Sequence, residues 1–277
     1  MEITFRRTPM PMRRSAVVVL SSLALLASAV RAEEQEWVLR IKNEAKQWSL
    51  SVGHTSVYGS GGPRIKGSGQ WVERTRAVAP FSRVRVDGPV DVRLAQAGAD
   101  GVKVGADDNV EALVTTAVEG DTLVVGLKPG SSFSTRQPVR VTVEFKDLQS
   151  LELKGSGDAR LDRLQGERLR VQLSGSGDLD IGLLEVREFT AALSGSGDLA
   201  VAGRVEQLDL QLSGSGDVSA SSLSSRQLRA TLSGSGDVQV GVSQELEAVL
   251  SGSGDLRYAG RPKVKSQVSG SGELMAR

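Results

Sequence analysis

A short glycine-rich motif returns seven times in the second half of the chain, and its spacing limits the folds available. Gly-Ser-Gly begins at residues 155, 175, 195, 214, 234, 252 and 270, so neighbouring copies lie 18 to 20 residues apart. Aspartate follows six of the copies, and Glu273 follows the last. A fixed period near 20 residues is typical of a solenoid, in which each repeat forms one coil.

Side chains between the motifs alternate with a period of two residues, as in a β-strand rather than a helix. Around the second copy, the apolar side of this alternation holds Leu169, Val171, Leu173, Leu179 and Ile181. The motif glycines fall on the same side, where the missing side chains permit a sharp bend or a close approach of the opposite wall. Each coil is therefore predicted to supply two strands joined at a glycine corner.

These features favour an all-β fold, a right-handed parallel β-helix with about 18–20 residues per coil. Other solenoids fit the sequence less well. Leucine-rich repeats carry an Asn/Cys ladder and an apolar helical side, which this composition does not provide. Calcium-binding rolls repeat every nine residues, and left-handed hexapeptide helices hold multiples of six.

Residues 80–153 lack the motif but continue the alternation, for example at Val84, Val86, Val90, Val92 and Leu94. Turns are expected near 98–101, 119–121 and 129–132, with one short helix at 107–117. The strands are either degenerate coils of the same β-helix or a small sheet that caps it. The predicted β-helix spans residues 80–277, with degenerate strands over 80–153 and repeat coils over 154–277.

The first 32 residues have the three parts of a secretory signal peptide. Basic residues come first, an apolar run from Ala16 to Val30 follows, and Val30-Arg31-Ala32 offers small residues at a cleavage site. The apolar run is shorter than the roughly 20 residues that a membrane-spanning helix needs. We therefore expect export with cleavage near Ala32, and no transmembrane segment in the mature chain.

Residues 33–79 give a weaker signal and are interpreted as an N-terminal segment followed by a tether. Trp37, Ile41 and Trp48 would share a helical face, yet Trp37 and Ile41 also alternate as in a strand, so both structures stay open. The stretch from Gly53 to Gly62 is glycine-rich, which is typical of a flexible tether. It contains His54, the only histidine, as a solvated loop residue.

Composition and charge exclude several classes of partner. The chain has no cysteine, so neither a disulfide nor lipid attachment at a cysteine can form. Removal of residues 1–32 leaves 29 basic and 32 acidic residues, a formal net charge of −3. Because the surface is weakly acidic and has no Lys/Arg block, nucleic acid is not expected as a partner. No cofactor is expected either.

The repeated aspartates are the first candidates for a functional site. If Asp178, Asp198, Asp217, Asp237 and Asp255 stack one coil apart, neighbouring carboxylates repel by about 0.9 kcal/mol in water. A Ca²⁺ ladder between them is one interpretation, because hard cations prefer oxygen ligands. The favoured interpretation is structural, with each aspartate bonding backbone N–H groups of a turn. Ser176 and its equivalents are likewise interpreted as a hydrogen-bonded ladder rather than a ligand-binding row.

A polysaccharide-degrading enzyme is the alternative function, because paired carboxylates can hydrolyse a glycosidic bond. Residues 151–277 contain only two aromatic residues, Phe189 and Tyr258, so sugar-stacking subsites are nearly absent. A serine nucleophile would need a basic partner, and His54 lies in the expected tether. No catalytic residue is assigned.

The order of several motifs resembles the bacterial head GIN domain family. The matching residues are Gly67-Ser68-Gly69, Arg74, Phe81-Ser82-Arg83-Val84, Asp91-Val92-Arg93-Leu94 and the repeated Ser-Gly-Ser-Gly-Asp. The resemblance covers roughly residues 65–277 and implies a right-handed β-helical domain of exported envelope proteins labelled as auto-transporter adhesins. It carries no catalytic residues.

The expected function is that of a structural or binding module, adhesin-like and without catalytic activity, in the periplasm, at the outer-membrane surface or outside the cell. The expected partner is a glycan or protein at a surface. A homo-oligomer is also expected, through the C-terminal end of the β-helix, where Pro262, Lys263 and Lys265 replace the aliphatic run.

Overall fold

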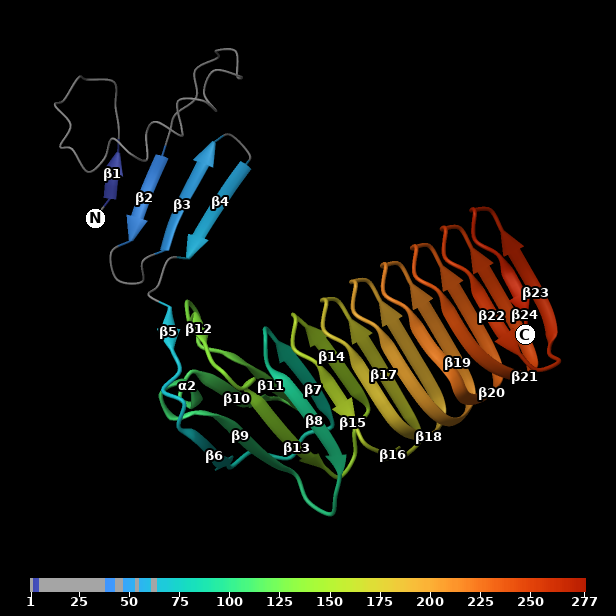
Figure 1. The fold of residues 1–277 in the computed structure, drawn as a ribbon, viewed down its shortest axis with the longest axis horizontal. Helices are drawn as coiled ribbons and strands as arrows, with labels where there is room; N and C mark the ends of the chain where they lie inside the picture. The colour runs from blue at the N-terminus through green and yellow to red at the C-terminus, as the bar shows by residue number, and fades with distance from the viewer. Residues whose placement is uncertain (1, 5–37, 43–46, 53–54, 61–63) are drawn as a thin grey trace, which may run out of the picture. The chain divides into compact units, whose positions relative to one another are not determined.

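The computed structural model of the chain describes residues 2–4, 38–42, 47–52, 55–60 and 64–277 (Figure 1). It contains two compact units, one of residues 1–64 with 129–132 and one of residues 65–128 with 133–277. Most of the predicted signal peptide, and also His54, lie outside the described residues. No helix within the described ranges is long and apolar enough to cross a membrane.

The first unit contains an antiparallel sheet of four strands. These are β1 (Glu2–Thr4), β2 (Val38–Lys42), β3 (Gln47–Val52) and β4 (Thr55–Ser60). Of the two structures left open for residues 37–48, the strand is the one found at 38–42. The tether interpretation is wrong for residues 55–60, which pair with β3 from Val52↔Thr55 to Gln47↔Ser60. Thr, Val and Tyr in β4 favour a strand over a flexible chain.

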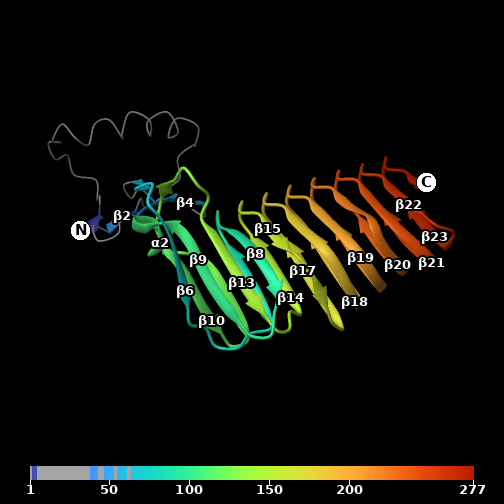
Figure 2. The same ribbon diagram turned by 60° about the horizontal axis from the view of Figure 1, so that its bottom comes forward.

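The second unit is a parallel β-solenoid, as the repeat period predicts. Its coils contribute to two sheets, which we name by their place relative to the Gly-Ser-Gly corners. Sheet I holds the strand segments that precede each corner, and sheet II holds the segments that follow it. Figure 2 shows the stacked coils from a second side. The handedness of the winding stays a prediction.

The longest strands run through both sheets, with their first part in sheet II and their last part in sheet I. These strands are β18 (Leu179–Leu193), β19 (Leu199–Leu212), β20 (Val218–Leu232) and β21 (Val238–Leu250). The other strands of the repeat region are β14 (Ser150–Lys154), β15 (Ala159–Leu161), β16 (Leu164–Gln165), β17 (Arg168–Leu173), β22 (Leu256–Ala259), β23 (Lys263–Val268) and β24 (Leu274–Ala276).

Neighbouring coils are paired in parallel so that equivalent residues stack. Leu173 pairs with Leu193, Leu193 with Leu212, and Leu212 with Leu232. These leucines are all at least 98% buried, as is Leu210. The predicted inward side of the alternation is therefore confirmed, and its aliphatic stacks form one continuous core.

Residues 80–153 supply both further coils and a cap, so the two alternatives left open by the sequence each hold in part. β7 (Arg83–Asp87) and β8 (Asp91–Gln96) pair in parallel with β14 and β15. On their other side they pair in parallel with β11 (Thr122–Leu127) and β13 (Arg140–Phe145). The coil that comes first along the chain is therefore the second in space.

Antiparallel strands cover the first coil in space. In sheet I, β10 (Val114–Glu119) pairs with β11. In sheet II, β9 (Gly101–Asp107) pairs with both β13 and β6 (Trp71–Arg76), so the sheet begins before residue 80. The helix α2 (Asp108–Glu111) joins β9 to β10, and the short strands β5 (Ile65–Lys66) and β12 (Phe133–Ser134) pair beside them. The predicted helix at 107–117 is correspondingly shorter, because pairing with β11 takes the residues from Val114 onward.

Candidate functional site

The Gly-Ser-Gly corners stack backbone directly on backbone. A Cβ atom added to Gly214 would lie 2.0 Å from the carbonyl oxygen of Gly195, and one added to Gly234 would lie 1.8 Å from that of Gly214. The second glycine of each motif is stacked in the same way, for example Gly216 on Gly197. The predicted glycine corner is therefore found, and the close approach that requires glycine there is that of the neighbouring coil, not of the opposite wall.

The motif aspartates form a ladder of hydrogen bonds along the corners. In each coil the backbone N–H of the aspartate donates to the Oδ1 of the aspartate one coil earlier. The N···O distances are 3.0 Å from Asp178 to Asp158, 2.9 Å from Asp198 to Asp178 and 2.8 Å from Asp217 to Asp198. The pattern continues to Glu273, whose N–H bonds Asp255 at 2.9 Å. The favoured structural role is found, with the bond running between coils instead of within one turn.

Near the last repeats, Arg257 contacts two aspartates of the ladder. The backbone N–H of Asp255 and the guanidinium of Arg257 both donate to Asp237 and hold its pKa below the ordinary value. Arg257 also bonds Asp255 at 2.9 Å, so it bridges two successive aspartates. The bridging guanidinium offsets part of the repulsion between these two carboxylates.

The five aspartates named as weak calcium candidates do lie in one row, at one corner of successive coils. Within the described ranges, no group of three or more His, Asp or Glu residues is placed to hold a metal ion. One oxygen of each candidate already accepts a backbone N–H, as at Asp217, which bonds the N–H of Asp237 at 2.8 Å. These hydrogen bonds between coils give the aspartate row a structural role at the corner.

A different serine from the one expected bonds across the coils. At five of the described corners, the hydroxyl group that reaches the neighbouring coil belongs to the serine before Gly-Ser-Gly. Ser194 donates to the carbonyl oxygen of Leu173, and Ser213 to that of Leu193, both at 3.3 Å. Ser196 and Ser215, at the centre of their motifs, donate through the backbone N–H instead, at 3.0 Å.

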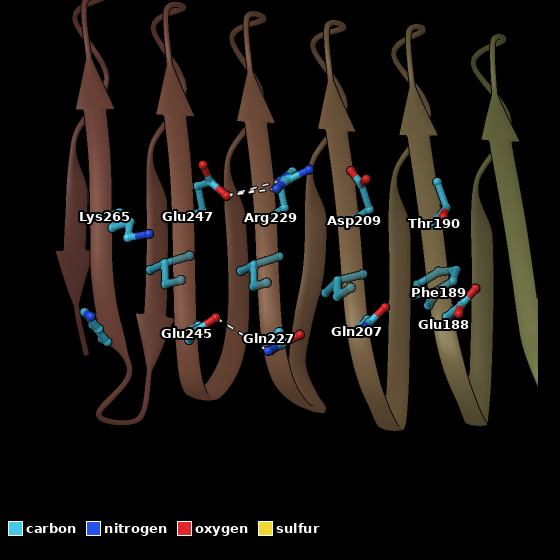
Figure 3. Close-up of a pocket in the computed structure, with 14 residues that line it drawn as sticks. Glu188, Phe189, Thr190, Gln207, Asp209, Gln227, Arg229, Glu245, Glu247 and Lys265 are labelled. Atoms are coloured by element: carbon cyan, nitrogen blue, oxygen red, sulfur yellow. Dashed lines mark hydrogen bonds and ion pairs between the residues drawn. The ribbon is translucent and has the colours of Figure 1, made fainter.

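Sheet I carries a groove of about 370 Å³ on its outer face (Figure 3). Two rows of side chains border it, and the strand backbone between them forms its floor. The first row is Glu188, Gln207, Gln227, Glu245 and Lys263. The second row is Thr190, Asp209, Arg229, Glu247 and Lys265. Parallel pairing aligns each row, so a ligand lying across the strands meets a new pair of side chains about every 4.8 Å.

Only part of the charge in this groove is neutralised within the protein. Arg229 pairs with Glu247 at 3.1 Å, and Gln227 approaches Glu245 at 3.5 Å. In the part of the chain that the structure describes, the groove residues without an ion pair are Glu188, Asp209, Glu245, Lys263 and Lys265. The groove therefore presents three carboxylates along its coils and two ammonium groups on the last coil.

Sheet II carries a second groove, of about 610 Å³, beside the aspartate ladder. Three of its charged residues form ion pairs. Arg93 pairs with Asp162, and Arg160 pairs with Asp180, each at 2.9 Å. Burial would raise the pKa of Asp162, but hydrogen bonds from Arg93 and Arg160 outweigh it and lower the value. Asp91, Asp158 and the other ladder aspartates on this face are used instead as acceptors for backbone N–H groups of the next coil.

The sequence did not single out either groove. The outward positions of sheet I vary from coil to coil, so no repeat marks them. The available signal was the alternation itself, which identifies Gln207, Asp209, Gln227 and Arg229 as outward neighbours on successive coils once the register is known. The two aromatic residues considered for sugar stacking are not on an open surface, since Phe189 is 1% exposed and Tyr258 is half-buried.

Residues 80–262 match the family described as "Putative auto-transporter adhesin, head GIN domain". The chain belongs to this family. The match covers the coils described above from β7 to β22 and confirms the resemblance found in the sequence. No curated protein matches the chain.

Solved structures share the fold of this head GIN domain at low sequence identity. A putative adhesin from Bacteroides fragilis is 23% identical, with a TM-score of 0.73 over 77% of this chain and 100% of that chain. A putative lipid binding protein from Parabacteroides distasonis is 24% identical, with a TM-score of 0.64 over 77% and 99%. A putative adhesin from Parabacteroides merdae is 21% identical, with a TM-score of 0.62 over the same shares.

Proposed function

We propose that the protein is an exported, adhesin-like binding module of the cell envelope that has no catalytic activity. Its family is described as adhesins, which supports export and binding rather than an enzymatic role. The groove on sheet I is the proposed contact surface, and the ligand is a glycan or a protein at a surface.

The observation that carries this proposal is the set of unneutralised charges in the groove. The carboxylates of this set lie on three coils, at Glu188, Asp209 and Glu245, and the ammonium groups of Lys263 and Lys265 lie on the last one. Side chains that the fold does not use for its own ion pairs are available to a ligand. Their even spacing along several coils suits an extended ligand with repeated polar groups.

A glycosidase is less well supported than a binding module. Glycosidases place one of their two carboxylic acids where its pKa is raised, so that it can protonate the leaving group. The carboxyl groups with a resolved shift here, Asp162 and Asp237, both have a lowered pKa. Both carboxylates also form ion pairs with arginines, Asp162 with Arg93 and Asp237 with Arg257, which is typical of a structural role.

The test is binding of the purified protein to an array of surface glycans and to immobilised matrix proteins. Gln207→Ala removes a hydrogen-bonding group from the groove, whereas Gln211→Ala removes the same group from the same strand outside it. Both side chains are exposed, so neither change should disturb folding.

Binding that Gln207→Ala weakens and Gln211→Ala leaves intact is the expected result. Equal effects of the two variants on binding would indicate that the ligand binds outside the groove. The absence of binding to every glycan and protein tested, or turnover of a polysaccharide by the protein, would contradict the proposal.

A further inference from the structure

The two ends of the solenoid differ in whether further strands cover the last coil. At the first coil in space, antiparallel β10 and β9 extend the sheets, and the core beneath α2 is closed, with Val110 fully buried and Val114 at 1% exposure. At the other end, β23 pairs only with β21 among the described strands, and every one of its residues is exposed (Figure 1).

The inward side chains of β23 show what this open end exposes. Val264 and Val268 are 37% and 47% exposed, whereas their neighbours one coil earlier, Leu246 and Leu250, are each 1% exposed. The outer edge of β23 also presents backbone N–H and C=O groups that can pair with another strand. Apolar side chains and an unpaired strand edge together form a surface suited to a further β-strand.

We propose that this end is the interface of a two-fold symmetric dimer, in which β23 pairs antiparallel with β23 of a second copy of the chain. A two-fold axis normal to the sheets continues both sheets from one copy into the other. This inference goes beyond the proposed function, because it concerns the assembly of the protein and not its ligand.

The residues of β23 select one register for that pairing. Residues directly opposite in an antiparallel pair lie on the same face. A register centred on Ser266 places Val264 opposite the partner's Val268 and Ser266 opposite the partner's Ser266. It also places Lys265 opposite the partner's Gln267, so no two lysines face each other. The register centred on Gln267 would place Val268 opposite the partner's Ser266, so its valines would not pack on each other.

The registers shifted toward the start of β23 are disfavoured by charge. Centring on Lys265 would place Lys265 directly opposite the partner's Lys265. Centring on Val264 would place Lys263 opposite the partner's Lys265 on both sides of the axis. Like charges directly opposite each other in a sheet are destabilising. The lysines that discourage indiscriminate edge pairing therefore leave the Ser266-centred register open.

Sedimentation equilibrium of the purified protein over a hundredfold concentration range tests the dimer. We expect a monomer–dimer equilibrium that stops at two copies. Val264→Asp with Val268→Asp should raise the dissociation constant at least about tenfold, because it places four carboxylates in the apolar contact. The matched control is Val249→Asp, since Val249 is also 37% exposed but lies on the outer face of sheet I.

A single cysteine gives a second test that does not depend on destabilising the end. The chain has no cysteine, so Ser266→Cys introduces its only thiol. Opposed residues of an antiparallel pair have Cα atoms roughly 4.5–5.5 Å apart, within the range that a disulfide spans. Oxidation should trap the Ser266→Cys dimer covalently, whereas Ser221→Cys, at an exposed position on β20, should form no disulfide-linked dimer.

A strict monomer at all concentrations, or a dimer unaffected by the two aspartates, would overturn the proposal. So would a dimer that Ser266→Cys fails to trap. Oligomers that keep growing with concentration would indicate head-to-tail stacking and would likewise exclude the two-fold interface.

Discussion

At the residue scale, the corner glycines are required by contact between coils. Gly214→Ala would place a methyl group 2.0 Å from the carbonyl oxygen of Gly195, so two backbones would have to separate. We expect a loss of about 1–3 kcal/mol in the free energy of unfolding, measured by chemical denaturation. Gly166→Ala is the control, because no atom lies within 4 Å of its added Cβ. Equal stability of the two variants would contradict this account.

The aspartate ladder makes a second prediction for single residues. Asp217→Ala removes the acceptor for the N–H of Asp237 and should cost about 0.5–1.5 kcal/mol of unfolding free energy. Asp217→Asn keeps an oxygen at that position and removes one charge from a row of carboxylates, so it should be as stable as the natural chain or more so. Denaturation of both variants checks the difference, and a more costly Asn than Ala would show that the charge is needed.

The Asp237–Arg257 contact predicts a pH dependence with a definite sign. Because the folded pKa of Asp237 is lowered, its contribution to stability is present above the ordinary carboxyl pKa of about 3.9 and is lost as the pH falls through the folded value. Arg257→Gln should therefore lower the Tm at neutral pH, and the difference should shrink in acid. The exposed Arg204, changed to Gln in the same way, serves as the control. A difference that grows in acid would refute this.

At the element scale, the aspartate row is expected to hold no essential cation. Its Oδ1 atoms are already used by backbone N–H groups in successive coils, as at Asp198 and Asp217. Treatment with EDTA should therefore leave the Tm unchanged, as measured by circular dichroism. A large drop that added Ca²⁺ reverses would support the calcium interpretation instead.

The coils of residues 154–277 were predictable because two periods agree there. The spacing of the glycine motifs gives the coil length, and the alternation around residues such as Leu210 gives the inward face. The order of the coils before residue 150 was not predictable, because β11 and β13 find their places through long-range pairing that no repeat marks. The helix predicted at 107–117 was too long for the same reason. The residues from Val114 onward pair with β11 instead of continuing the helix.

The candidate site was predictable only in part. The aspartate row follows from the repeat itself, and its structural role follows from the chemistry of a short carboxylate beside glycine. The groove on sheet I depends on the register that sets Asp209 beside Arg229 and Arg229 beside Glu247. Alternation shows that these residues point outward, but not which of them lack an ion-pair partner.

At the scale of the whole molecule, the N-terminal residues predict processing. Cleavage near Ala32 should remove the basic and apolar segments and leave Glu33 as the first residue, with the loss of β1. Mass spectrometry of the protein isolated from the envelope of its native host is the measurement. A native protein that retains Met1 would rule this processing out.

The stacking of coils has a mechanical consequence. Each coil from β18 to β21 is hydrogen-bonded only to the coils beside it, and its strands lie across the direction of stacking. A force applied between the two ends of the stack would therefore load the hydrogen bonds of one coil at a time. Each coil that opens would release about 60 Å of chain at roughly 3.3 Å per residue. A pull on the molecule would be absorbed in a series of small steps instead of a single rupture.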